Sequence, residues 1–278
     1  MTASALDFDA LENRDLDAVA ALVKTLKWPH RPEDIALFMR LGAGRIARDG
    51  SGELLGVALW WAFEPAAARL GLVMVDPASQ GRGIGRRLVE QVLADAGGRS
   101  MKLLATEAGK PLYDSLGFVE IGACRQYQGT YGGSPAADTG IREARPEDMR
   151  AILALDAVAF GAGRAAVLRA LMGAGRAVVL DGGSGASGYA MERDFGRGTV
   201  VGPIVAPTEQ AAIRLFQALA RPGFVRVDLP VIGDTFARHL VDCGLTAAGA
   251  DSPVMVLGDW PDPMNDPRLF ALSSHALG

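Results

Sequence analysis

Three glycines stand at alternate positions where an apolar run gives way to an amphipathic one: Gly81, Gly83 and Gly85. Glycine has no side chain, so it permits a tight turn in which successive N–H groups face one concave pocket. A helix that begins just after the turn adds partial positive charge and unpaired donors, which suits a diphosphate. Full charges beside this pocket could come from Arg82, Arg86 and Arg87. The alternative is a plain glycine-rich turn with solvated arginines, because glycine spacing alone is a weak signal.

The elements around the glycines have an α/β order with mixed strands. Apolar periodicity predicts helices over 13–27, 32–41, 84–96 and 109–116. Apolar runs bounded by turn residues predict strands over 44–49, 53–63, 68–75, 101–107 and 118–127. The glycines follow several strands, which excludes a full Rossmann domain, and no Lys-Ser or Lys-Thr pair follows them, which excludes a P-loop.

Composition limits the class of protein. The 278 residues exceed the roughly 100 to 200 of one domain, and a 49% hydrophobic share can bury a sizeable core. A net charge of -4 argues against nucleic acid as a partner. Two distant cysteines, Cys124 and Cys243, predict neither a disulfide framework nor a metal site. With no leader-like segment and no long apolar stretch, we expect a cytoplasmic protein without a membrane partner.

The two halves of the chain resemble each other. Three pairs of segments match in order, at slowly shrinking offsets: 13–23 with 146–156, 75–80 with 205–210, and 114–118 with 241–245. Small loop deletions between two copies of one fold would leave this pattern. We therefore predict two domains, 1–133 and 141–278, joined by the Gly- and Pro-containing stretch 131–140.

The stretch "QGRGIG" resembles the acetyl-CoA diphosphate loop of the GNAT superfamily of N-acetyltransferases. Gln80, Gly83 and Gly85 fill the pattern of Gln or Arg, two residues, Gly, one residue, then Gly or Ala. "LGLVMVDP" before the loop and "KPLYDSLGF" after it also resemble family segments, so the resemblance covers nearly all of residues 6–130. The second half resembles a divergent GNAT domain of tandem members, on "AFGAGR" and "LFALSSHALG". The resemblance implies two tandem GNAT-like domains with mixed α/β sheets.

The resemblance implies an acyltransferase that moves acetyl from acetyl-CoA to a primary amine by direct attack on the thioester. In GNAT enzymes the strand before the loop splays from its neighbour and bonds the pantetheine arm, here through Val73 and Val75. Tyr113 stands where the family protonates the departing thiolate, although a tyrosine in an amphipathic helix can also be a core residue. The expected cofactor-binding loop comprises Gln80, Gly81, Arg82, Gly83, Ile84, Gly85 and Arg86.

The general base is open, because the strand over 68–75 contains no acid where family members often carry a Glu. We rank Glu107, at the end of the next strand, first and His30 second. His30 has a suitable ordinary pKa, but a single histidine can equally be structural or solvent-exposed.

Aromatic residues and one further acid are candidates for the wall of the acceptor site. The expected substrate-binding residues are Trp28, Trp60 and Glu64. Strand alternation sends Trp60 and Trp61 to opposite faces, so at least one of the two packs in the core. We expect a small-molecule amine as acceptor in preference to a protein, and a monomer or homodimer.

The second half lacks the chemistry of the first. Gln210 aligns with Gln80, but the aligned glycines and tyrosine are replaced, by Ala211, Ile213, Leu215 and Leu240. We expect no catalysis there and instead a supporting role, in which residues 141–278 cover part of the acceptor site with "RLFALSSHALG" as an apolar contact. The alternative function is a non-catalytic module that senses acyl-CoA or a metabolite.

Overall fold

The computed structural model describes residues 6–183, 185–230, 235–261 and 266–278. The helices of the first half are α1 (Leu16–Thr25), α2 (Pro32–Leu41), α3 (Ile84–Asp95) and α4 (Lys110–Ser115). Its strands are β1 (Leu6–Ala10), β2 (Ala43–Asp49), β3 (Leu54–Phe63), β4 (Ala67–Val75), β5 (Ser100–Leu104) and β6 (Val119–Tyr131). Every helix and strand predicted for this half is present. β1 was not predicted, and β6 is longer than its predicted range.

The second half repeats this order after a stretch, 132–138, without helix or strand. Its helices are α5 (Met149–Phe160), α6 (Ala165–Ala174), α7 (Glu209–Leu219) and α8 (Thr235–Asp242). Its strands are β7 (Ile141–Glu143), β8 (Gly175–Asp181), β9 (Ala186–Phe195), β10 (Gly198–Ala206), β11 (Gly223–Pro230), β12 (Thr246–Ala247), β13 (Ser252–Leu257) and β14 (Arg268–Ala271). The two copies expected from the sequence are therefore visible as a repeated series of elements.

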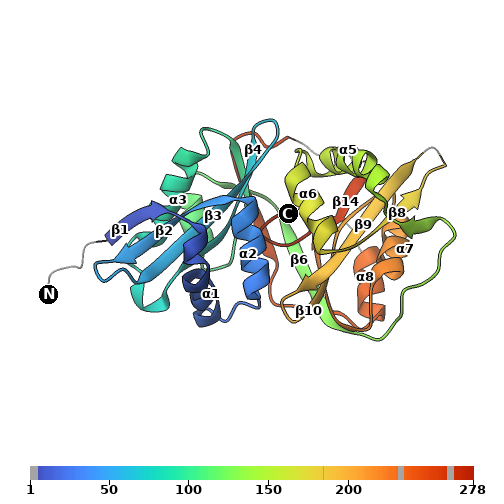
Figure 1. The fold of residues 1–278 in the computed structure, drawn as a ribbon, viewed down its shortest axis with the longest axis horizontal. Helices are drawn as coiled ribbons and strands as arrows, with labels where there is room; N and C mark the ends of the chain where they lie inside the picture. The colour runs from blue at the N-terminus through green and yellow to red at the C-terminus, as the bar shows by residue number, and fades with distance from the viewer. Residues whose placement is uncertain (1–5, 184, 231–234, 262–265) are drawn as a thin grey trace.

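The two halves share one continuous sheet. Over the described residues its path is β1-β2-β3-β4-β5-β13-β6-β11-β10-β9-β8-β7. β13, from the second half, lies between β5 and β6 of the first half, and β6 continues along β11 of the second. Figure 1 shows β6 running between the two halves, with the C-terminus close by. The sheet therefore runs without a break across the predicted boundary at 133 and 141.

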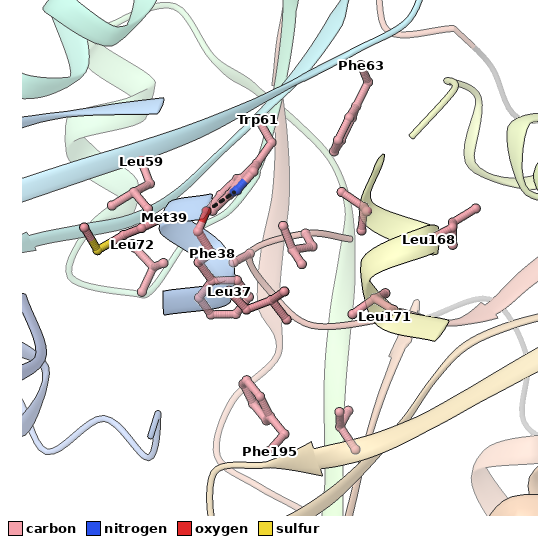
Figure 2. Packing of buried hydrophobic residues seen from close by; sticks show 14 of the residues in the cluster. Leu37, Phe38, Met39, Leu59, Trp61, Phe63, Leu72, Leu168, Leu171 and Phe195 are labelled. Carbon is pink, nitrogen blue, oxygen red and sulfur yellow. Dashed lines mark hydrogen bonds between the residues drawn. The ribbon is translucent and has the colours of Figure 1, made fainter. Parts of the chain in front are cut away.

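Helices cover both faces of the sheet. One hydrophobic core spans both halves and includes residues of α1, α2, α5 and α6. Figure 2 shows part of this core, with Phe38 and Trp61 from the first half and Leu171 and Phe195 from the second. The indole of Trp61 donates to the Phe38 carbonyl at 3.0 Å. On the opposite face, α3 and α4 close the core of the first half, and α7 and α8 close that of the second.

The exchanged strands predict the behaviour of a chain that ends at Ser134. This chain lacks β13, so β5 and β6 lose the strand between them, and the fully buried Met255 leaves the core. Unpaired strand edges promote association between chains. We therefore expect the shortened chain to form aggregates on size-exclusion chromatography, whereas the full chain stays dispersed.

A second shortened chain supplies the control, because it restores the missing strand. It joins Cys124 through an Asn-Gly turn to Ser252–Leu257, which keeps the native pairing of Ser252 with Cys124. We expect this chain to aggregate less and to retain more of the circular dichroism of a folded sheet. A monodisperse, folded chain ending at Ser134 would show that β13 is dispensable and that the argument is wrong.

Candidate functional site

β4 and β5 diverge along their length. Their parallel pairing covers only three positions, from Ala67 with Ser100 to Arg69 with Lys102. Beyond Arg69 the two strands separate, and a cavity of about 700 Å³ occupies the opening. Its lining comes from the second half of β4, the loop before α3, the end of β5 with the turn that follows, α4, and the loop between α1 and α2. The splayed pair of strands expected from the resemblance is present.

The backbone of β4 turns toward this cavity at two predicted positions. The Asp76 N–H donates to the Leu55 carbonyl on β3 at 2.8 Å, so the polar groups of Asp76 face β3. Backbone groups alternate in direction along a strand, so those of Val75 and Val73 face away from β3, toward the opening. Just before them Leu72 has a φ of 51° where the register with β3 shifts, which marks a β-bulge.

The glycine-rich loop has the conformation that its residues imply. Gly81 and Gly83 have φ values of 75° and 76°, the left-handed region in which L side chains are strained. Gly85 has no such φ, and a Cβ there would lie at ordinary contact distance, 3.5 Å from Val75 and 3.7 Å from Leu112, so the space at this position also fits an alanine. Gln80 donates to the Val75 carbonyl at 3.3 Å, which folds the loop back onto β4.

α3 directs its first turn at the same loop. Gly83 is its N-cap residue, and the Gly83 carbonyl accepts from the Arg87 N–H at 3.1 Å. The N–H groups of the preceding residues, Ile84 to Arg86, have no helix carbonyl before them. They and the positive end of the helix dipole can bind an anion at the cavity mouth.

The three arginines of the loop differ in their surroundings. Arg86 lines the cavity and donates to the Ser115 hydroxyl at 2.6 Å, which ties α3 to α4. Arg87 lies over the ring of Phe8 on β1, 4.2 Å from its centroid. Arg82 is exposed and does not line the cavity. Of the three, Arg86 is therefore the one held beside the predicted diphosphate position.

Tyr113 lies on α4, is 7% exposed and lines the cavity. Its ring packs edge-on against Phe118, with centroids 5.7 Å apart. Burial raises the pKa of the Tyr113 phenol well above its ordinary value, so the hydroxyl keeps its proton at neutral pH. The side chain is thus a core contact that also lines the cavity and carries a protonated phenol.

The structure does not bring the other predicted residues to the cavity, except Trp28. Glu107 is exposed and outside the lining, although its neighbours Thr106 and Ala108 belong to it. Glu64 is exposed at the far end of β3, where its backbone pairs with Gly163 of the second half. Trp60 is partly buried and packs against the hydrophobic core that contains α3 residues, outside the cavity lining. Spacing in the sequence does not tell which face of the sheet a strand residue points to, or which end of a strand lies at the cavity. These two features decide why the three side chains do not reach it.

His30 lies in an aromatic cluster. Its ring centroid is 5.9 Å from that of Trp28, 5.7 Å from Phe38 and 5.2 Å from Phe195. Its Nδ1 atom is buried with no hydrogen-bond partner in the described part of the chain. Burial, reinforced by the charge of Arg226, lowers the pKa of His30 to about 4. The ring is therefore neutral at pH 7, weakly basic and outside the cavity lining.

The C-terminal segment was expected to make an apolar contact with the first half, and sequence reasoning missed that it also accepts hydrogen bonds from β4. Arg69, 2% exposed, donates to the main-chain carbonyls of Ala276 at 3.1 Å and His275 at 2.8 Å. A Cβ on Gly71, which lines the cavity, would lie 3.2 Å from the Cα of Ala276. An arginine inside the apolar run 67–75 was the available signal, because a buried guanidinium requires polar partners.

The equivalent opening in the second half is filled. β10 and β11 pair at only two positions, Thr199 with Val225 and Val200 with Arg226, and then diverge. β14 occupies this space, where it pairs with β10 over Ile204–Ala206.

The second half also has no long loop before its helix. β10 ends at Ala206 and α7 begins at Glu209, so the glycine loop is deleted and not merely substituted. Gln210, which aligns with Gln80 by sequence, lies within the first turn of α7. The Thr208 hydroxyl accepts from the Ala211 N–H at 3.1 Å and caps this helix. Among the residues that the structure describes, β14 fills the groove and Thr208 caps the helix N-terminus.

Comparison with known families agrees with this geometry. Two family profiles, each described as an acetyltransferase (GNAT) domain, match residues 43–120 and 152–271. The chain therefore belongs to the GNAT N-acetyltransferases and carries two GNAT domains in tandem. Members of this family typically use acetyl-CoA.

Individual relatives extend over nearly the whole chain. An uncharacterized N-acetyltransferase of Bacillus subtilis (strain 168), YitH, is 26% identical over 260 residues, 90% of this chain and 91% of the relative. A putative acetyltransferase from Pyrococcus horikoshii has a TM-score of 0.81 at 20% identity, covering 100% of this chain and 98% of its own. A tandem GNAT protein from the clavulanic acid biosynthesis pathway has a TM-score of 0.63 at 16% identity, covering 91% and 98%.

Among the described residues, no helix combines the length and the apolar character that crossing a membrane requires.

The environment of His30 predicts how stability depends on pH. The pKa of His30 is about 4 in the folded chain and 6.5 by its ordinary value, so the unfolded chain binds the proton first as pH falls. His30 therefore contributes stability that is full above pH 6.5 and is lost as the pH falls toward 4. His30→Phe keeps an aromatic ring and removes this dependence. From pH 7 to pH 5 the native chain should lose about 1–2 kcal/mol more unfolding free energy than the variant.

Urea unfolding at both pH values measures this difference, and comparing the two chains cancels the carboxylates that both contain. Parallel loss of stability in the native chain and the variant would contradict the neutral, buried state assigned to His30.

Proposed function

We propose that this protein transfers the acetyl group of acetyl-CoA to a primary amine, and that the reaction takes place only in the first half. The observation that carries the proposal is the contrast between the two splayed strand pairs. β4 and β5 enclose an open cavity beside the left-handed glycine loop, whereas the gap between β10 and β11 holds β14. One half has a place for a long, anionic thioester and the other does not.

The residues of the cavity fit the parts of acetyl-CoA in order. N–H groups from Gly81 to Arg86 would hold the diphosphate at the start of α3. The free backbone edge of β4 at Val73 and Val75 would bond the amide groups of the pantetheine arm, as a neighbouring strand would. Acetyl-CoA supplies an activated thioester, whose carbonyl carbon would lie between β4 and β5.

Tyr113 completes the reaction. When the amine attacks the thioester carbonyl and the carbon–sulfur bond breaks, the departing thiolate needs a proton. The Tyr113 hydroxyl retains its proton because burial raises the pKa of the phenol, and it lies in the cavity wall. Neither Glu107 nor His30 lines the cavity, so we propose no side-chain base for the amine. The amine would lose its proton to solvent water at the cavity mouth, and the Tyr113 phenolate would regain a proton from solvent.

The acceptor we propose is a small-molecule amine. The cavity passes between β4 and β5, and residues of both faces of the sheet line it, Tyr113 and Ile84 on one face and Leu26 and Trp28 on the other. Mass spectrometry of a panel of small primary amines incubated with acetyl-CoA tests the activity, with release of free thiol as the second readout. Acetyl-CoA binding without any acetylated product would favour the alternative, a sensor of acyl-CoA.

The contrast between the halves predicts one CoA site per chain. Gly83→Glu places a negative side chain in the open space at the start of α3, where the diphosphate would bind. Juxtaposed like charges cost several kcal/mol, so CoA affinity should fall by about 100-fold or more. Gly97→Glu is the matched control, since Gly97 also has a positive φ and open space but lies beyond the end of α3.

Isothermal titration calorimetry of the native chain and both variants with CoA gives the stoichiometry and affinity. Two equal sites in the native chain, or equal losses in Gly83→Glu and Gly97→Glu, would contradict the proposal.

The proposed role of Tyr113 predicts a change in turnover. Tyr113→Phe removes the hydroxyl and keeps the ring against Phe118. Turnover with a saturating amine should fall by about 10²- to 10⁴-fold, the usual contribution of a positioned acid, while the Kd for acetyl-CoA changes little. Unchanged turnover in a single-turnover experiment, which excludes product release as the limiting step, would remove Tyr113 from the mechanism.

A further inference from the structure

The turn between β9 and β10, in the second half, sits against the loop between α1 and α2, in the first. A Cβ on Gly196 in this turn would lie 2.8 Å from the Pro29 carbonyl oxygen, so the two backbones are in close contact. Phe195, which precedes it, lies 6.4 Å from Phe38 and 5.2 Å from His30 between ring centroids. Figure 2 shows Phe195 extending from its strand toward Phe38.

Asp34, on the first turn of α2, fastens the turn to the loop. Its Oδ2 accepts from the Arg31 N–H at 2.9 Å and from the Gly196 N–H at 3.0 Å. Its Oδ1 accepts from the Arg31 guanidinium at 3.0 Å, and the same nitrogen of Arg31 donates to the Asp194 carbonyl at 2.8 Å. Asp34 is 2% exposed, and Arg193 of β9 approaches it to 3.7 Å.

The carboxyl of Asp34 is ionised in this setting. Burial raises its pKa, but hydrogen bonds from Arg31 and Gly196 more than offset the burial, so the pKa lies below its ordinary value. Hydrogen bonds to an ionised group are about twice as strong as neutral ones. One buried carboxylate therefore holds two segments that are 162 residues apart in the sequence.

The same loop supplies the wall of the cavity on the face opposite α3 and α4. Leu26 and Trp28 line the cavity and pack with the core of the α1 and α2 face. Ile84 and Tyr113 line it from the other face. If the diphosphate binds at α3, an amine that reaches the thioester from the α1 and α2 face meets Trp28. The main-chain N–H of Trp28 donates to the Val23 carbonyl at 3.1 Å, which fixes the start of the loop.

We propose that Asp34 is a positioning residue for the acceptor: it seats the α1–α2 loop on the β9–β10 turn, and so holds Trp28 in the acceptor wall. The second domain then sets the shape of the acceptor site without catalytic residues of its own. The inference rests on the proposed acetyl transfer, which it deepens by assigning the acceptor to the α1 and α2 face.

Asp34→Asn in the full chain tests the proposal through the acceptor. It removes the charge and half of the acceptor capacity while keeping the shape. The KM for the amine should rise by about 10-fold, and the Kd for acetyl-CoA should stay within about twofold. Asp148→Asn is the matched control, because Asp148 is 7% exposed and accepts from the Arg145 N–H at 2.7 Å in the second half. The control should leave the amine KM unchanged.

A double-substitution cycle shows whether Asp34 acts through Trp28. In a Trp28→Ala background, Asp34→Asn should change the amine KM by less than about twofold, because interacting positions are not additive. An equal KM rise in Asp34→Asn and Asp148→Asn, an effect confined to acetyl-CoA, or full additivity with Trp28→Ala would overturn the proposal.

Hydrogen exchange separates this proposal from the proposed function, because it needs no acceptor. Asp34→Asn should speed exchange of the amides over 26–31 and leave those over 80–86 unchanged. If no amine is acetylated but the loop alone loosens, the acetyl transfer is wrong and the fastening by Asp34 stands. If exchange over 26–31 is unchanged, the fastening itself is wrong.

Discussion

The placement of β13 between β5 and β6 is the constraint on which the rest of the structure depends. Each half pairs a late strand with the fifth strand of the other, β6 with β11 and β13 with β5, so backbone hydrogen bonds run through the whole sheet. Neither half can therefore satisfy its central strands alone. The same exchange places the C-terminal segment against Gly71, which lines the cavity, and the turn at Gly196 against Pro29 of the α1–α2 loop.

The two copies of the fold meet one requirement in different ways. A splayed strand pair exposes backbone N–H and C=O groups, and such groups need partners when they are buried. In the second half β14 supplies them, and its following residue, Leu272, also pairs with Asp228 of β11. In the first half the corresponding edge of β4 faces a cavity. The second half also lacks the glycine loop. A loop that binds a diphosphate has no use beside a groove that β14 already fills.

Buried charges at the junction have partners from both halves. Arg69 of β4 donates to the carbonyls of His275 and Ala276, and Asp34 of α2 accepts from Gly196. Leaving one such group unpaired costs more than the net gain of forming the pair, so these contacts define the relative position of the halves more than they add stability.

Local pattern was enough to predict the helices of the first half, all its strands except β1, the repeat, and the loop at Gly81 and Gly83, because periodicity and left-handed glycines act within a few residues. The sequence alone also placed Tyr113 on a helix after the loop. The sequence could not show whether the side chains of Glu107, Glu64 and Trp60 point toward the cavity. Their directions depend on where each strand ends and on how it pairs with its neighbours. Strand exchange, β14 in the second groove and the Asp34 contact with Gly196 join residues far apart in the chain, and only tertiary packing decides such contacts.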